Sequence, residues 1–239
     1  MEPAPFFNEI AQGPPDGQAW WMMSTDGQRL RGAFWPGGKR GTVLILPGRT
    51  EYIERYGCVA NALMQRGFST LTLDYRGQGL SDRLMSPEDR GHIGEFQDYQ
   101  LDVAALLRLA KHIDCPKPFF LFASSMGGCI ALRALHDGLP VNAAVINAPM
   151  WGIAMSGAER FAARVIGALC QNTAIGRWRV PSTPKANLVL SQPFDGNPGT
   201  RSAEMYNYLQ DQARALPQMT VTGPSFRWLY QALSEIDTL

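Results

Sequence analysis

Residues 121–128 read Leu121-Phe-Ala-Ser-Ser-Met-Gly-Gly128, and this stretch joins a strand pattern to a helix pattern. The run Pro118–Ala123 is short and apolar, whereas Met126–His136 has the apolar spacing of a helix. A serine on such a tight strand-to-helix turn stands above the sheet with its hydroxyl exposed. Small neighbours two residues away, here Ala123 and Gly127, let strand and helix approach closely. The stretch therefore predicts Ser125 as a catalytic nucleophile.

The usual pattern around such a serine is Gly-x-Ser-x-Gly, and alanine replaces the first glycine here. We interpret this as a variant of the motif, with Ser124 as a bystander and with Gly127 and Gly128 as the glycines of the turn. An ordinary turn rich in small residues is the alternative interpretation. The position between a strand and a helix favours the nucleophile, and the N-terminus of that helix suits a developing oxyanion.

Further apolar runs alternate with helical patterns through the first 150 residues, which predicts an α/β fold with a mostly parallel, doubly wound sheet. Residues 20–23 and 30–35 predict an antiparallel hairpin before it. The other predicted strands are Thr42–Pro47, Ser69–Asp74 and Ala143–Ala148. The other predicted helices in this part are Glu51–Arg66, ending at Gly67, and Tyr99–His112.

The rhythm of the sequence changes after Pro149, where prolines separate helical stretches. We predict a helical cap over the sheet at residues 150–224, with helices at Glu159–Cys170 and Ala203–Leu216. Residues 1–149 would then form the N-terminal part of the core. Residues 225–239, with a helix at Ser225–Ile236, would begin the return to that core.

Composition and charge exclude several classes of protein. A net charge of +1 over 239 residues predicts no nucleic-acid partner. The four cysteines, at positions 58, 115, 129 and 170, lack metal-site spacing and are expected to be reduced. No signal-like leader and no membrane-spanning run is evident, so we expect a cytoplasmic protein, with peripheral membrane contact left open. No metal and no cofactor is implied, and the oligomeric state stays unknown.

Three further segments carry a resemblance to a known family. These are Leu46-Pro-Gly-Arg-Thr-Glu-Tyr-Ile-Glu-Arg-Tyr56, Asp74-Tyr-Arg-Gly-Gln-Gly-Leu-Ser-Asp82 and Gly91-His-Ile-Gly-Glu-Phe-Gln-Asp-Tyr99. With the serine turn, they make the chain resemble bacterial α/β-hydrolases of the lysophospholipase and monoacylglycerol-lipase type, a serine aminopeptidase S33-like group, over roughly residues 15–239.

This resemblance implies an oxyanion hole built from the backbone N–H groups of Arg49 and Met126, although Pro47-Gly48 stands where the family usually has His-Gly. An ordinary strand-to-helix turn is the alternative for residues 48–50. The stretch Asp74–Asp82 is the most specific match. We expect its polar residues and glycines to hold the shape of a loop rather than to take part in catalysis.

The resemblance also implies a chain order of Ser, then acid, then His, with the last two on loops after later strands. The three histidines, His92, His112 and His136, are all expected to be structural. Asp237 follows a helix and is not assigned as the acid. We therefore expect the C-terminal strands and helices of the fold to be absent from residues 1–239, Ala143–Ala148 to form an exposed edge, and the chain alone to be inactive.

The expected function is hydrolysis of carboxylic esters of single-acyl lipids, such as lysophospholipids or monoacylglycerols, through an acyl-enzyme on Ser125. Met150 and Trp151 are candidates for lining the acyl pocket, although apolar cap residues are more often simple core. Four further apolar cap residues are candidates of the same kind: Met155, Phe161, Ile166 and Trp178. The alternatives are a peptidase or small-ester esterase of the same fold, and a non-catalytic binding module.

Overall fold

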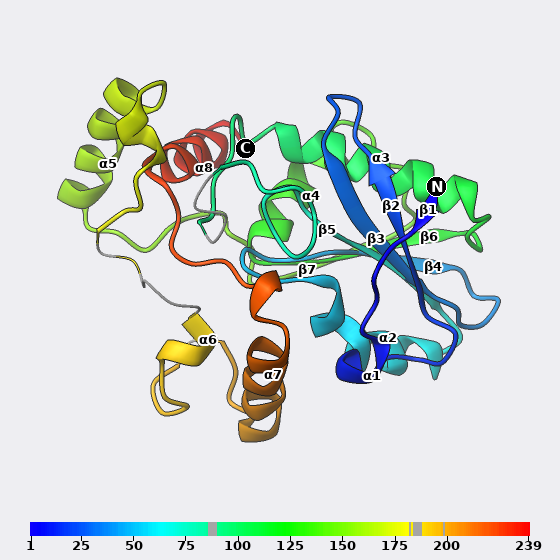
Figure 1. The fold of residues 1–239 in the computed structure, drawn as a ribbon. Helices are drawn as coiled ribbons and strands as arrows, with labels where there is room; N and C mark the ends of the chain where they lie inside the picture. The colour runs from blue at the N-terminus through cyan, green and yellow to red at the C-terminus, as the bar shows by residue number, and fades with distance from the viewer. Residues whose placement is uncertain (86–89, 182, 184–187, 198) are drawn as a thin grey trace.

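A seven-stranded sheet forms the centre of the described structure, a computed structural model of the chain (Figure 1). The structure describes residues 1–85, 90–181, 183, 188–197 and 199–239. The order of the strands is β1-β2-β3-β5-β4-β6-β7, with β5, β4, β6 and β7 parallel and the first three antiparallel. Their bounds are β1 Glu2–Pro3, β2 Gln18–Met23, β3 Arg29–Trp35, β4 Thr42–Leu46, β5 Ser69–Asp74, β6 Phe119–Ser124 and β7 Ala144–Asn147.

The predicted hairpin and the four predicted parallel strands are all confirmed. The two-residue strand β1 was not predicted, because so short a segment carries no pattern of its own. Chain order reverses at β4, since β5 lies on one side of it and β6 on the other. The carboxyl ends of β4 and β6 are therefore adjacent, which is where open α/β sheets bind their ligands.

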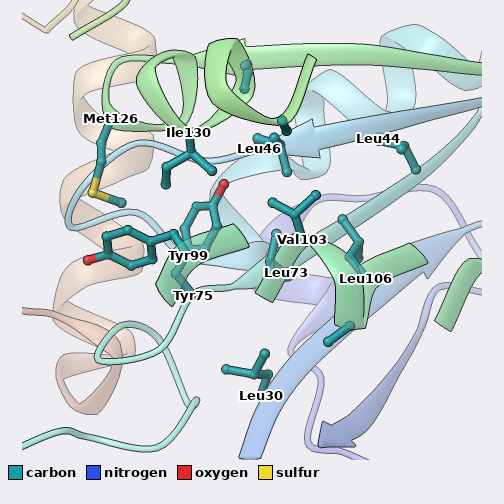
Figure 2. Close-up of a cluster of buried hydrophobic side chains, with 14 of the residues drawn as sticks. Leu30, Leu44, Leu46, Leu73, Tyr75, Tyr99, Val103, Leu106, Met126 and Ile130 are labelled. Atoms are coloured by element: carbon teal, nitrogen blue, oxygen red, sulfur yellow. The ribbon is translucent and has the colours of Figure 1, made fainter. Parts of the chain in front are cut away.

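Side chains of β4 alternate between two buried layers. Leu44 and Leu46 pack with residues of α3 and α4, and Figure 2 shows them in this cluster beside Val103 and Ile130. Val43 and Ile45 belong to the opposite layer with Tyr56. Helices thus cover both faces of the sheet, which explains why the strand is a continuous apolar run.

Most of the predicted helices are confirmed. The exception is Glu51–Arg66. Helical structure begins there only at Ile53, because Thr50 adopts a positive φ of 68° and Tyr52 is extended, and a 3₁₀ helix precedes the α-helix. The helices are α1 Asn8–Ala11, η1 Ile53–Tyr56, α2 Gly57–Met64, α3 Asp98–His112, α4 Met126–His136, α5 Gly157–Cys170, η2 Ala174–Arg177, α6 Leu188–Ser191, α7 Ala203–Ala215, η3 Pro217–Met219 and α8 Phe226–Thr238.

The loop that follows β5 has the structural role predicted for it. Asp74 accepts hydrogen bonds from the Leu80 backbone N–H at 2.8 Å and from the Ile53 N–H at 2.9 Å. Its backbone oxygen accepts the Ser81 hydroxyl at 2.6 Å. A Cβ at Gly79 would lie 2.0 Å from the Asp74 carboxyl carbon, so only glycine fits there. Polar bonds and a close approach therefore fix the loop.

Two arginines with buried side chains tie this loop to the rest of the core. Arg31 bridges Asp74 and Glu54, with Nε 2.8 Å from Asp74 Oδ2 and Nη2 2.7 Å from Glu54 Oε2. Arg76 bonds Asp102 at 2.8 Å. Each cation has a carboxylate partner with good geometry, as charges removed from water require.

The described residues of the segment 150–224 are mainly helical and contact the core at several places. Helix α7 is anchored by Tyr208, whose hydroxyl donates to the Ala11 backbone oxygen, and by Gln212, whose amide donates to the Glu54 backbone oxygen at 2.9 Å. The chain then returns through α8, whose Trp228 is buried in the main core. Figure 1 places α5 and α7 on the side where β6 and β7 end. The division at residues 149 and 224 remains a prediction.

Strand β7 is the outermost parallel strand of the described sheet. Its Val145 is 62% exposed, whereas all five residues of β4 are buried. The expected exposed apolar edge is therefore present.

Candidate active site

Ser125 occupies a strained turn between the end of β6 and the start of α4. Its φ of 51° and ψ of −119° lie outside the regions that L-residues favour. The Ser125 backbone oxygen accepts the N–H groups of Gly128 and Met150, each at 2.9 Å, and its N–H donates to the Asn147 oxygen at 3.2 Å. These three bonds hold the turn, and the serine itself is exposed. The turn thus lies between a strand and a helix, as the sequence predicts, and the role of Ser125 as nucleophile remains a proposal.

The two glycines after Met126 allow α4 to lie against the strands. A Cβ at Gly127 would be 2.1 Å from the Leu46 backbone oxygen. One at Gly128 would be 2.8 Å from the side chain of Ile146. Ala123 is fully buried in β6, so the small residue on the other side of the motif also faces a crowded environment.

The loop after β4 passes beside this turn. A Cβ built on Gly48 would lie 3.2 Å from Ser125 Cβ, so the two loops meet at the carboxyl ends of β4 and β6. Met126 is the first residue of α4, where backbone N–H groups lack intrahelical acceptors. The structure thus brings Arg49 and Met126, predicted as oxyanion-hole residues, to the same side of the sheet as Ser125. Their role as donors remains a proposal.

The Arg49 side chain lies among buried groups. Its Nη1 donates to the Thr222 backbone oxygen at 3.0 Å, and its guanidinium lies 5.2 Å from the centre of the Trp228 ring. Burial lowers the pKa of Arg49 to about 10. The side chain therefore links the loop after β4 to α8.

A pocket of about 350 Å³ opens beside Ser125. Neither Met150 nor Trp151 borders this pocket, and their role in lining an acyl pocket remains a prediction. The main chain explains the difference, because Met150 lies behind the turn, where its N–H bonds the Ser125 oxygen, and Trp151 is 52% exposed. The four other predicted lining residues, Met155, Phe161, Ile166 and Trp178, do not line this pocket either.

Residues near α6 and α7 line it instead. Their positions follow from the tertiary placement of these helices, for which the sequence carries no local signal. The described residues that border the pocket are Arg49, Thr50, Glu51, Arg55, Ser124, Ser125, Asn147, Ala148, Val189, Gln192, Asn197, Gly199, Thr200, Tyr206 and Leu209.

None of the three histidines borders the pocket at Ser125. His92 Nδ1 lies 2.8 Å from the Ser225 hydroxyl, and burial together with nearby arginines lowers its pKa to about 4. His112 ends α3, and His136 ends α4 on the exposed surface. Asp237 of α8 pairs with Arg164 of α5 and does not border the pocket at Ser125. The structural roles predicted for the three histidines remain predictions.

The described residues also include the cysteines, the possible metal ligands and the helices that bear on the expectations from composition. The four cysteines, all described, are unpaired. Among the described residues there is no cluster of three or more metal-ligating side chains. No described helix is both long and apolar enough to span a bilayer.

Comparison with known proteins gives consistent results. The model of a hydrolase family described as serine aminopeptidase, S33, matches residues 37–239. Lysophospholipase L2 of Escherichia coli K12 is 31% identical over 206 residues, covering 80% of this chain and 56% of the relative. A probable lysophospholipase L2 of Haemophilus influenzae is 26% identical over 201 residues, covering 84% and 62%. The chain thus spans little more than half the length of these curated relatives.

Solved structures agree on the fold. A soluble variant of monoglyceride lipase from Saccharomyces cerevisiae, in complex with a substrate analogue, superposes with a TM-score of 0.67 at 19% identity, covering 99% of this chain and 71% of that one. A carboxyl esterase from Bacillus coagulans gives 0.64 at 16% identity, covering 92% and 72%. These likenesses confirm the predicted α/β-hydrolase fold.

Proposed function

Because the chain belongs to the serine aminopeptidase S33 family of hydrolases, we propose that it cleaves carboxylic esters of single-acyl lipids through an acyl-enzyme on Ser125. The observation that carries this proposal is the exposed serine at positive φ, beside a pocket of about 350 Å³ and next to the loop of Gly48 and Arg49. The names of the two lysophospholipase relatives support the class of substrate.

The chemistry would proceed in two steps. The Ser125 hydroxyl oxygen attacks the acyl carbonyl carbon, its proton passes to a base, and the carbonyl oxygen becomes an oxyanion that the N–H groups of Arg49 and Met126 stabilise. The alcohol leaves with a proton, and water then releases the fatty acid by the same route. Preorganised donors of this kind contribute about 3 kcal/mol each to the barrier.

None of the three histidines borders the described pocket, which supports the proposal that the general base for Ser125 is not supplied by residues 1–239. We therefore expect this chain by itself to turn over esters slowly or not at all, in contrast to the complete gene product. The absence of a histidine there also favours a second candidate function for residues 1–239, that of a binding module that holds single-acyl lipids without cleaving them.

A fluorophosphonate probe, applied to residues 1–239 and to the complete gene product, tests the nucleophile. We expect the complete protein to be labelled on the tryptic peptide that contains Ser125, as located by mass spectrometry. Fatty-acid release from lysophosphatidylcholine and monoacylglycerol should exceed cleavage of an aminoacyl anilide. Faster anilide cleavage would favour a peptidase, and a folded complete protein without any labelling would favour the binding module.

We also propose that the surface of α5 and η2 contacts anionic membranes. Phe161, Val165 and Leu169 recur every four residues along α5 and are all exposed, Leu169 by 75%. Residues 150–181 contain four arginines and a single acidic residue, Glu159, and one of the four, Arg164, pairs with Asp237 of α8. An apolar helix face with cationic flanks suits a bilayer that contains anionic lipid.

Co-sedimentation of residues 1–239 with phosphatidylglycerol-containing vesicles tests this surface. Replacing Leu169 by glutamate should lower the partition coefficient about tenfold or more, because burying such a side chain in lipid contributes about 2 kcal/mol. Met23→Glu is the matched control, since Met23 is 56% exposed at the end of β2. Equal loss in both variants, or binding indifferent to vesicle charge, would contradict the proposal.

A further inference from the structure

Two buried or half-buried side chains hold the peptides on either side of Arg49. The Gly48 N–H donates to Glu51 Oε2 at 2.5 Å, and the Thr50 N–H donates to Gln78 Oε1. The N–H of Arg49 lies between them and donates no hydrogen bond to any described residue. Of three successive N–H groups, the outer two are therefore tied to the protein and the middle one is left for a ligand.

Glu51 and Gln78 are themselves held in place. Glu51 Oε2 also accepts the Tyr56 hydroxyl at 2.5 Å, and the Glu51 N–H closes a turn onto the Gly48 oxygen at 3.4 Å. The Gln78 backbone bonds Tyr75 and Ser81 at 3.0 and 3.1 Å, within the rigid loop after β5. That loop therefore reaches the loop after β4 through one amide.

Burial of the Gln78 side chain costs free energy of folding, which indicates that this amide does more than fill space. Its side chain is only 3% exposed, and its Nε2 has no hydrogen-bond partner among the described residues. A buried amide group left without a partner costs about 1–3 kcal/mol. Among the described residues, its Oε1 accepts one hydrogen bond, which comes from the backbone N–H of Thr50, a residue with a positive φ of 68°. An apolar side chain would fill the same space without the unpaired donor, but it would not fix the Thr50 peptide.

We propose that Gln78 and Glu51 are positioning residues, which orient the peptide of Arg49 so that its N–H faces the developing oxyanion. The inference rests on the proposed hydrolase function of Ser125. An oxyanion donor acts only within about 2.7–3.1 Å of the oxygen, so a small rotation of this peptide removes its effect. Oriented donors need support from surrounding groups, and these two residues supply it from opposite sides of the loop.

The test uses the complete gene product and two inhibitors with equal alkyl chains. With a decyl-chain trifluoromethyl ketone, the Ser125 oxygen bonds the carbonyl carbon, the serine proton passes to the base, and the carbonyl oxygen becomes an oxyanion. The corresponding secondary alcohol has the same alkyl and trifluoromethyl groups and binds without a covalent step and without an oxyanion. In variants that keep Ser125 and its base, a change in the ratio of the two inhibition constants therefore reports on the covalent adduct and its oxyanion, apart from binding of the alkyl chain.

We expect Gln78→Met to lower kcat and raise the inhibition constant of the ketone, each about 10- to 100-fold. KM and the inhibition constant of the alcohol should change less than about twofold. Glu51→Met should behave alike, whereas Glu51→Gln keeps an oxygen acceptor and should restore most of the lost rate. If Gln78→Met does not fold, the comparison of Glu51→Met with Glu51→Gln still tests the proposal.

Gln212→Met is the matched control, because Gln212 is a buried glutamine whose amide also bonds backbone, but on α7. It should lower stability while leaving the ratio of the inhibition constants unchanged. Equal changes for ketone and alcohol in the Gln78 and Glu51 variants, or no change at all, would overturn the positioning role. A parent protein that the ketone does not inhibit would instead overturn the proposed function.

Discussion

Replacing Ser125 by alanine in the complete gene product is expected to lower kcat for single-acyl esters by about five to six orders of magnitude. The substitution removes the oxygen that forms the acyl-enzyme, and no other described group bordering the pocket shares its position on the strand-to-helix turn. KM should change little, because the hydroxyl contributes mainly to the reaction rather than to binding of the ester. Initial rates with a p-nitrophenyl ester, normalised to folded protein, measure the effect.

Ser124→Ala is the control that separates two adjacent hydroxyl groups. Ser124 is the last residue of β6 and pairs with Asn147 in the sheet, without the positive φ of its neighbour. We expect this variant to retain activity within about threefold. Comparable losses from both substitutions would show that the motif had been assigned to the wrong serine or that the turn itself had collapsed.

The core of the fold was predictable because its signals are local. The run Thr42–Leu46 is apolar at every position after Thr42, as a strand buried on both faces requires, and the structure buries all five residues. The serine turn was predictable for a related reason. The helix after it lies so close to the neighbouring strands that Gly127 and Gly128 have no room for a side chain, and these glycines are visible in the sequence.

The pocket was not predictable in the same way. Val189, Tyr206 and Leu209 reach it because α6 and α7 pack at a particular place over the sheet. That placement depends on bonds between distant residues, such as Gln212 to the Glu54 backbone. The division of Glu51–Arg66 has the same origin, since the Glu51 carboxylate bonds Gly48 and Tyr56 and keeps the start of the segment out of a helix.

Gly127→Ala is expected to destabilise the fold by about 3 kcal/mol or more and to abolish labelling of Ser125. Alanine normally favours a helix over glycine by up to about 1 kcal/mol, so helix propensity alone predicts a stabilising change. The added Cβ would lie 2.1 Å from the Leu46 oxygen and 2.5 Å from the Pro47 oxygen, and both are backbone atoms of β4 and its loop. Helix α4 must therefore move away from the strand, and overpacking of this kind exceeds the gain in propensity.

Alanine variants at two further glycines, Gly128 and Gly157, provide graded controls for Gly127→Ala. A Cβ at Gly128 would lie 2.8 Å from Ile146 Cγ2 and Pro149 Cβ and 3.0 Å from Pro149 Cα, which is less close than the contacts at Gly127, so Gly128→Ala should cost about 1–2 kcal/mol. Gly157 begins α5 with nothing within 4 Å of the added atom, so its alanine variant should be neutral or slightly stabilising. Urea denaturation of the three variants measures this order. A Gly127→Ala protein as stable as Gly157→Ala would mean that α4 does not rest on β4, and the oxyanion hole, which needs both elements in contact, would lose its structural basis.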